Sequence, residues 1–231
     1  MLAFQSDLNY SATAFRHAKA MRYQSATTES QPGHFRQWRT ILLIFALAAC
    51  FGSAACRASS GQSSELVFND LEGTPRRPLE IGNKAATVLI FYWHDCPVCN
   101  SYAPEINRIF LSHTNFAFYI IQVDPDLTAA AARKHAREYQ LRPPVLLDPQ
   151  HRLVNIAKAT VTPEAIVLGK DAKELYRGRI DDLYPALGKK RSSATQHDLR
   201  DALDAITTGQ PVKNRQTQAI GCLISTPSTS N

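Results

Sequence analysis

The sequence lacks several features that would place it in the zinc-binding or nucleic-acid-binding classes. Only one pair among its five cysteines is closely spaced, so the four thiolates of a structural zinc site are missing. Its formal net charge is only +6, and residues 1–49 contribute to that excess with five Lys or Arg against two Asp or Glu. Because the remaining positive charge is small and scattered, we expect no nucleic-acid partner.

The sequence also lacks an apolar run long enough to cross a membrane near its start. The run at residues 41–51 covers 11 residues. As a helix it would span roughly 16 Å, whereas the hydrocarbon core of a bilayer is about 30 Å thick. A signal-peptide core therefore explains this run better than a stable transmembrane helix.

The end of this run predicts the cellular location of the protein. Arg36 and Arg39 precede it, and it closes in Leu47-Ala48-Ala49-Cys50, which resembles the lipobox of bacterial lipoproteins. The resemblance implies a leader over residues 1–49, with an uncertain N-terminal extension, and a lipid on Cys50 that anchors the protein to a membrane facing the periplasm or exterior. Two alternatives are an ordinary signal or uncleaved anchor, and a buried helix with an accidental cysteine.

The rest of the chain divides into a tether, a folded domain and a tail. Gly and Ser in residues 50–64 predict a flexible tether, and residues 210–231 form a polar C-terminal tail. Between them, residues 65–209 alternate strand and helix patterns and predict an α/β domain with a central sheet flanked by helices. Expected strands are 66–68, 86–93, 116–123, 145–147, 165–168 and 174–177; expected helices are 104–111, 128–139, 153–159 and 197–206.

The chemistry is concentrated in Cys96-Pro97-Val98-Cys99, which follows the apolar strand at 86–93. A cysteine that ends a buried strand and opens a helix lies beside free N–H groups and the positive end of the helix dipole, and both favour a thiolate. Cys96 is therefore the expected nucleophile. Cys99, one helical turn further on, is placed to attack a mixed disulfide on Cys96. A metal site or a purely structural bridge are the alternatives.

These residues resemble the thioredoxin-like superfamily, and the likeness covers about residues 65–209. Thr162-Pro163 agrees with it, because it resembles the Thr-Pro whose cis proline packs against the two sulfurs of that fold. The resemblance is greatest to the redoxin branch, of the alkyl hydroperoxide reductase/thiol-specific antioxidant type. It implies a thioredoxin-like central mixed sheet and substrate docking by Thr162, Pro163, Trp93 and Pro97.

Some positions depart from the patterns of these families. Peroxiredoxins carry Pro and Thr or Ser seven and three residues before their reactive cysteine, where this chain has Leu89 and Trp93. Thioredoxin carries a buried Asp where this chain has Ile90. We expect Trp93 to pack in the core and rim or to form an apolar lip over the sulfur. A general base, if one acts, would be Glu105, Asp95 or His94.

Cys222 lies in an apolar island, residues 219–224, within the polar tail. Two hypotheses remain open for it. The island covers a hydrophobic groove and its thiol is inert, or Cys222 is an additional thiol that exchanges with Cys96.

The leading functional hypothesis is an extracytoplasmic thiol-disulfide oxidoreductase that uses Cys96 and Cys99 to reduce protein disulfides. Its partners would be protein or small-molecule disulfides and an upstream electron-donor thiol protein, and it would need no cofactor and no metal. One alternative is a peroxiredoxin-like thiol peroxidase. Another is a copper chaperone resembling the Sco proteins, with His135 or His151 as a distant ligand.

Overall fold

The structure is a computed structural model that describes residues 66–225. The predicted leader, the lipidation site at Cys50 and the tether lie outside the described residues. Within residues 66–225, no helix combines the length and apolar character needed to cross a membrane.

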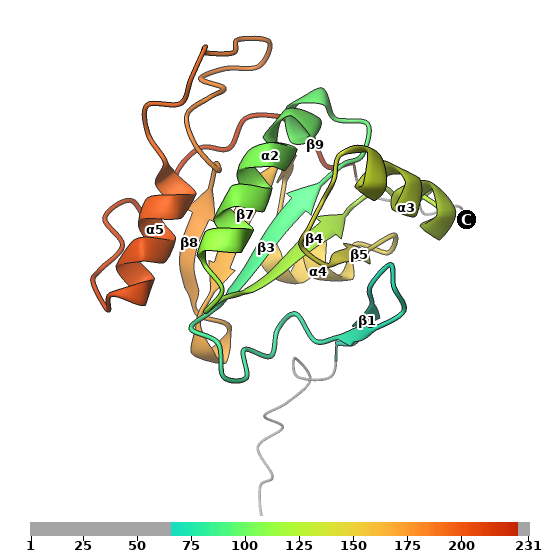
Figure 1. The fold of residues 1–231 in the computed structure, drawn as a ribbon, viewed down its shortest axis with the longest axis horizontal. Helices are drawn as coiled ribbons and strands as arrows, with labels where there is room; N and C mark the ends of the chain where they lie inside the picture. Colours follow the sequence, from blue (N-terminus) through green and yellow to red (C-terminus); the bar gives the residue numbers. More distant parts are fainter. Residues whose placement is uncertain (1–65, 226–231) are drawn as a thin grey trace, which may run out of the picture. The chain divides into compact units, whose positions relative to one another are not determined.

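A five-stranded mixed sheet forms the centre of the fold (Figure 1). Its strands, in spatial order, are β5 (Val145–Leu147), β4 (Ala117–Gln122), β3 (Thr87–Tyr92), β7 (Glu164–Leu168) and β8 (Glu174–Gly178). β3, β4 and β5 are parallel to one another, whereas β7 is antiparallel to both β3 and β8. All six residues of β3 are buried, as its continuous apolar run predicts for a strand covered on both faces.

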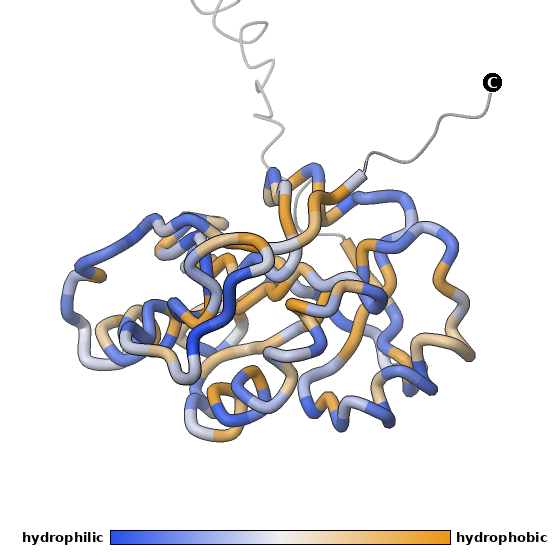
Figure 2. Tube along the Cα trace, turned by 90° about the horizontal axis from the view of Figure 1, so that it is seen from above, coloured by the Kyte–Doolittle hydropathy of each residue, from blue (hydrophilic) through white to orange (hydrophobic). Residues whose placement is uncertain are grey.

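Successive side chains of β3 supply two separate cores, because they point to opposite faces of the sheet. Ile90 and Tyr92 belong to the core under α2 (Pro97–Ser112), α3 (Ala129–Glu138) and α5 (Asp198–Thr207). Leu89 and Phe91 belong to the core under α4 (Arg152–Ala157). Figure 2 shows apolar segments gathered in the interior and hydrophilic segments along the outer loops.

Two short two-stranded sheets accompany the central one. β1 (Phe68–Asn69) pairs with β2 (Pro75–Arg76), and β6 (Val161–Thr162) pairs with β9 (Cys222–Leu223), both in antiparallel register. A short 3-10 helix, η1 (Lys170–Ala172), joins β7 to β8. β9 comes from the apolar island of the tail and therefore fastens this part of the tail to the domain.

The predicted α/β class and central mixed sheet are confirmed. The five central strands and all four helices appear within a few residues of their expected positions, except that α2 begins at Pro97 and not near Pro104. Proline inside a helix removes one backbone hydrogen bond. Burial of Val98, Cys99, Tyr102 and Ile106 along the same helix offsets that loss. β2, β6 and β9 were not predicted, since two-residue strands leave no detectable period.

Replacement of Phe91 by alanine will lower the free energy of unfolding by about 3 to 5 kcal/mol, the usual cost of removing a large buried ring. Phe91 is fully buried at the centre of the sheet, so loss of its ring would leave a cavity in the core. Urea unfolding of both proteins will measure this. Leu187→Ala is the matched control, because Leu187 is 70% exposed and its loss will change stability by under about 0.5 kcal/mol.

Candidate active site

Cys96 occupies the N-cap position of α2, four residues after the last residue of β3. Pro97 follows at the first helical position, where its missing N–H has no helical partner to lose. The Cys96 side chain makes no capping hydrogen bond and is fully buried. The local sequence therefore brings a sulfur to the positive end of a 16-residue helix, as the strand-then-helix pattern predicts.

Cys99 lies in the first turn of the same helix and is also fully buried. Its sulfur carries no disulfide in this structure. Burial raises the pKa of the Cys99 thiol to about 12, against the smaller opposing effect of nearby hydrogen-bond donors. In this form of the protein Cys99 is therefore a protonated thiol at neutral pH.

Thr162 and Pro163 lie directly beside Cys96. The Thr162–Pro163 peptide bond is cis, as predicted, and Thr162 is fully buried. The Cys96 Sγ atom lies 3.5 Å from the carbonyl oxygen of Thr162. The structure thus brings the Cys96–Cys99 motif close to the Thr162–Pro163 motif, which is distant in the sequence. The two motifs meet beyond the C-terminal end of β3.

The structure joins Cys96 to Cys222, and not to Cys99, by a disulfide bond. The two Cα atoms are 6.2 Å apart, and 126 positions separate the residues in the sequence. A disulfide to Cys96 differs from the hypothesis that the Cys222 thiol is inert. It is the bond expected if Cys222 exchanges with Cys96. The apolar island lies over the site because β9 pairs with β6, in a register that sets Cys222 opposite Thr162.

A hydrogen-bonded group of polar side chains supports the helix end that carries the cysteines. Asn100 donates from Nδ2 to the His94 carbonyl oxygen at 2.8 Å, and this orients its amide. Its Oδ1 accepts from Tyr92 Oη at 2.8 Å and lies 2.9 Å from His135 Nε2. His135 Nε2 therefore carries the proton, since an amide oxygen can only accept. Asn100 was not singled out from the sequence, although it directly follows Cys99.

The three groups considered as general bases lie in different surroundings. His94 Nδ1 lies 3.1 Å from Asp124 Oδ2, and His94 Nε2 lies 3.2 Å from Asp95 Oδ1. The Asp95 side chain is largely exposed at 74%. Glu105 is buried and forms ion pairs with Arg108 and Arg200, so its carboxylate is engaged on the helix face.

The remaining predicted site residues have ordinary polar partners. Trp93 is half-buried, packs against both cores and donates from Nε1 to Asp124 Oδ2 at 3.4 Å. His151 is buried, and its Nε2 lies 2.7 Å from the Val123 carbonyl oxygen. With His135 bonded to Asn100, each histidine considered as a metal ligand has a protein partner at Nε2.

Glu164 is a further buried acid that was not among the predicted site residues, although it directly follows Pro163. Its carboxylate lies 3.3 Å from Arg177 Nη1, and its Oε2 accepts from the Thr160 N–H at 3.3 Å. Burial raises the pKa of Glu164 more than Arg177 lowers it. The pair connects the start of β7 to β8 beside Thr162 and Pro163.

His135→Gln will reduce the loss of stability on acidification. Burial, with the nearby His94, lowers the pKa of His135, so the folded protein keeps this ring neutral. Below about pH 6.5 the unfolded chain gains a proton there that the folded chain does not, and stability falls as pH falls. Urea unfolding at about pH 7.5 and pH 5.5 will show a smaller difference in the variant. Lys134→Gln, at an exposed neighbouring position, will retain the wild-type difference.

Comparisons with known proteins agree with this geometry. Residues 64–173 match the model of the AhpC/TSA family. Thiol-disulfide oxidoreductase ResA of Bacillus cereus is 25% identical over 114 residues, which are 48% of this chain and 64% of ResA. The chain thus spans less than two thirds of the length of the curated relatives it matches.

Two solved structures share the fold. An uncharacterized conserved protein from Geobacillus kaustophilus has a TM-score of 0.61 and 26% identity, over 69% of this chain and 87% of its own. A hypothetical protein from Sinorhizobium meliloti 1021 has a TM-score of 0.59 and 24% identity, over 69% and 89% of the two chains. Residues 64–173 therefore form an AhpC/TSA redoxin domain of the thioredoxin-like superfamily.

Proposed function

We propose that the protein is a thiol-disulfide oxidoreductase that reduces protein disulfides outside the cytoplasm. The main support is the position of Cys96, at the N-terminus of α2 and in contact with Thr162, with a second thiol one turn along the helix. That Cys96 bonds to a cysteine from a distant segment further supports a sulfur that engages other thiols. The ResA relative, named as a thiol-disulfide oxidoreductase, supports the same chemistry.

The reaction follows from two thiol exchanges. The thiolate of Cys96 attacks one sulfur of a substrate disulfide, and the other substrate sulfur leaves as a thiolate that takes a proton. Cys99 then loses its proton and attacks the Cys96 sulfur, which releases the second substrate thiol and leaves a Cys96–Cys99 disulfide. The substrate gains two electrons, and an upstream thiol protein returns them to the enzyme.

The location is part of the proposal and depends on residues outside the described part of the chain. The basic residues, short apolar run and Leu47–Cys50 pattern favour a leader cleaved before a lipidated Cys50. Metabolic labelling of cells with a radioactive fatty acid will test this. We expect label on the wild type and none on Cys50→Ser, and label on both would reject this anchor.

Insulin reduction by the wild-type protein tests the activity itself. With dithiothreitol as the electron source, we expect the protein to accelerate reduction of the insulin disulfides at least about tenfold over dithiothreitol alone, since the positive end of α2 favours the thiolate form of the attacking sulfur. A rate equal to that of dithiothreitol alone would reject the proposal.

A thiol peroxidase is a second candidate, favoured by the AhpC/TSA match of residues 64–173. Leucine and tryptophan have no hydroxyl group that could hold a peroxide, and here Leu89 is fully buried in the core while Trp93 bonds to Asp124. Stopped-flow oxidation by hydrogen peroxide separates the two functions. We expect the reduced protein to react no faster than free cysteine, and a much faster rate would favour the peroxidase.

A further inference from the structure

The segment from Arg215 to Ile224 extends along two strand edges of the domain and ends over the reactive sulfur. At the first edge, Arg177 of β8 donates its N–H to Arg215 and accepts from the N–H of Thr217, both at 2.9 Å. At the second edge, β9 pairs with β6, and the Ile224 N–H donates to the Thr160 carbonyl oxygen at 3.0 Å. Two sets of backbone hydrogen bonds therefore set the register of this segment.

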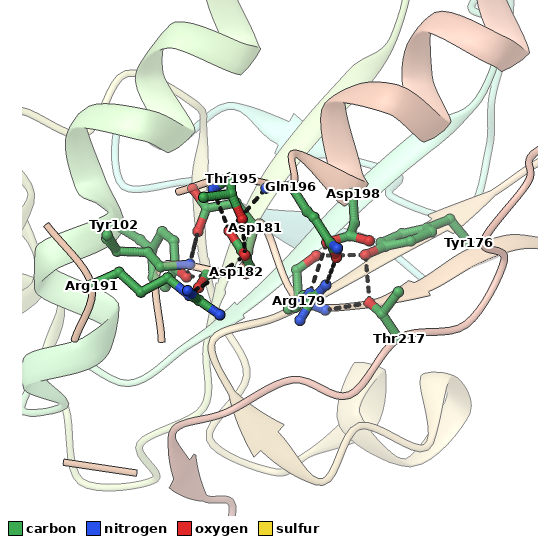
Figure 3. A network of polar contacts seen from close by, with 11 residues as sticks. Tyr102, Tyr176, Arg179, Asp181, Asp182, Arg191, Thr195, Gln196, Asp198 and Thr217 are labelled. Atoms are coloured by element: carbon green, nitrogen blue, oxygen red, sulfur yellow. Dashed lines mark hydrogen bonds and ion pairs between the residues drawn. The ribbon is translucent and has the colours of Figure 1, made fainter. Parts of the chain in front are cut away.

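Thr217 fastens the first part of the segment through its side chain (Figure 3). Its hydroxyl lies 2.8 Å from Tyr176 Oη and accepts from the Arg179 N–H at 3.1 Å. Tyr176 in turn donates to the Arg179 carbonyl oxygen at 2.5 Å. Because Tyr176 is fully buried, this anchor connects the tail to the domain core.

The two edges require glycine where the backbones approach most closely. A Cβ at Gly221 would lie 1.9 Å from the carbonyl oxygen of Thr162, far inside contact distance. A Cβ at Gly178 would lie 2.3 Å from the carbonyl oxygen of Thr217. Gly221 immediately precedes Cys222, so β9 can lie against β6 only because this residue has no side chain.

β9 occupies the position that a polypeptide substrate of Cys96 would need. An extended chain pairs with an exposed strand edge through its backbone, and the β6 edge is the one that adjoins Cys96. Cys222 on β9 is bonded to Cys96, as the cysteine of a substrate would be in the mixed disulfide. With β9 in place, Cys96 has no exposed surface.

The contacts also allow the strand to leave without disturbing the core. A cavity of about 680 Å³ lies beside the tail, and its lining includes Glu164, Arg177 and Gly221. The Leu223 side chain is 78% exposed. The island is thus held by the hydrogen bonds between β9 and β6, one disulfide and the packing of Cys222 and Ile224 against the two cores, so its release leaves the rest of both cores packed.

We propose that residues 219–224 are an intramolecular substrate strand that closes the active site, covalently when Cys222 is bonded to Cys96, and that transfer of the disulfide to Cys99 opens it. The proposal rests on the function proposed above. It assigns the tail a regulatory role at the same site. A polypeptide disulfide must displace β9 before it can reach Cys96.

The opening step is a balanced exchange without net oxidation. The Cys99 thiol loses its proton and the thiolate attacks Cys96 Sγ, which forms the Cys96–Cys99 bond and breaks the Cys96–Cys222 bond. Cys222 leaves as a thiolate and takes a proton from solvent. Because the pKa of Cys99 is raised in the closed form, the attacking thiolate is scarce at neutral pH and the closed form persists.

Disulfide mapping tests whether the closed form exists. The purified wild-type protein, oxidised by a small disulfide and digested without reduction, should yield a peptide pair linked through Cys96 and Cys222. This measurement does not depend on any enzymatic activity. Recovery of Cys96 linked only to Cys99 would overturn the proposal even if the protein reduces insulin.

Rates of insulin reduction test whether β9 blocks the site. Gly221→Ala displaces β9 while it keeps the sulfur, and Cys222→Ser removes the covalent bond while it keeps the strand. We expect Gly221→Ala to raise the initial rate at least about fivefold, and Cys222→Ser to raise it when the reaction is started from oxidised protein. Lys134→Gln, an exposed change on α3 away from the tail, is the control, and we expect it to show the wild-type rate.

The outcomes distinguish this proposal from the function on which it rests. Wild-type rates in both test variants would overturn the closing role while leaving the reductase intact. A Cys222→Ser protein that loses insulin reduction would also overturn it, because Cys222 would then carry the disulfide forward. If no variant reduces insulin but the Cys96–Cys222 link is recovered, the reductase fails and the closed form stands.

Discussion

Cys96→Ser will abolish insulin reduction, with a decrease on the order of 10³-fold or more, because a hydroxyl group cannot replace a thiolate as the nucleophile. The geometry makes this the largest effect on activity. Cys96 lies at the positive end of α2 and beside Thr162, where it is bonded to a cysteine from a distant segment. Cys99 lies inside the first turn of α2, and burial raises the pKa of its thiol to about 12, so it is a poor replacement for Cys96 as the nucleophile.

The measurement compares Cys96→Ser with wild type and with Lys134→Gln, an exposed change on α3 that should leave the rate unaltered. Urea unfolding of each protein ensures that a lost rate reflects lost chemistry and not lost structure. After the rate with dithiothreitol alone is subtracted, residual turnover within tenfold of wild type would show that another group acts as the nucleophile.

Cys99→Ser will separate the two exchange steps and reduce insulin turnover on the order of 100-fold. The first attack by Cys96 needs no sulfur at position 99, so its rate constant should stay within about twofold of wild type. The second attack then has no thiol, and the mixed disulfide between Cys96 and the substrate should accumulate as a covalent complex on a non-reducing gel. Rapid quenching with acid will give both rate constants.

The role of Cys222 makes the double variant Cys99→Ser/Cys222→Ser informative. If Cys222 closes the site, it can also release a trapped substrate slowly, and the double variant should hold the mixed disulfide longer than Cys99→Ser. Equal lifetimes would show that Cys222 does not reach the mixed disulfide. Unchanged turnover in Cys99→Ser alone would remove Cys99 from the reaction.

Much of the fold could be predicted because its strands and helices follow from patterns of apolar residues within short segments. The apolar run at β3 is continuous and predicts a strand buried on both faces, and all its residues are buried. The Thr162–Pro163 motif and the Cys96–Cys99 spacing each lie within a few residues. The strand-then-helix pattern predicted Cys96 at a helix start, and the resemblance to the thioredoxin-like superfamily implied the cis bond.

The rest of the site could not be predicted, because it depends on contacts between segments that are distant in the sequence. Cys96 and Cys222 lie 126 positions apart, and β6 and β9 have only two residues each. Asn100 looks like an ordinary helix residue in the sequence, and its bonds to Tyr92 and His135 exist only once β3, α2 and α3 pack together. The apolar character of residues 219–224 indicated that this island would cover a hydrophobic groove, without showing which part of the domain it covers.

The predicted end of the domain at Gly209 differs from the observed packing, since Thr217 and β9 bond to the domain beyond it. A shortened protein that stopped at Gly209 would leave the outer edges of β8 and β6 with unpaired N–H and C=O groups. Such edges pair readily with other chains. Two full-length molecules could pair the N–H and C=O groups of the same edges by exchanging their C-terminal strands. The tail that covers one active site therefore also gives this fold a route to a domain-swapped dimer.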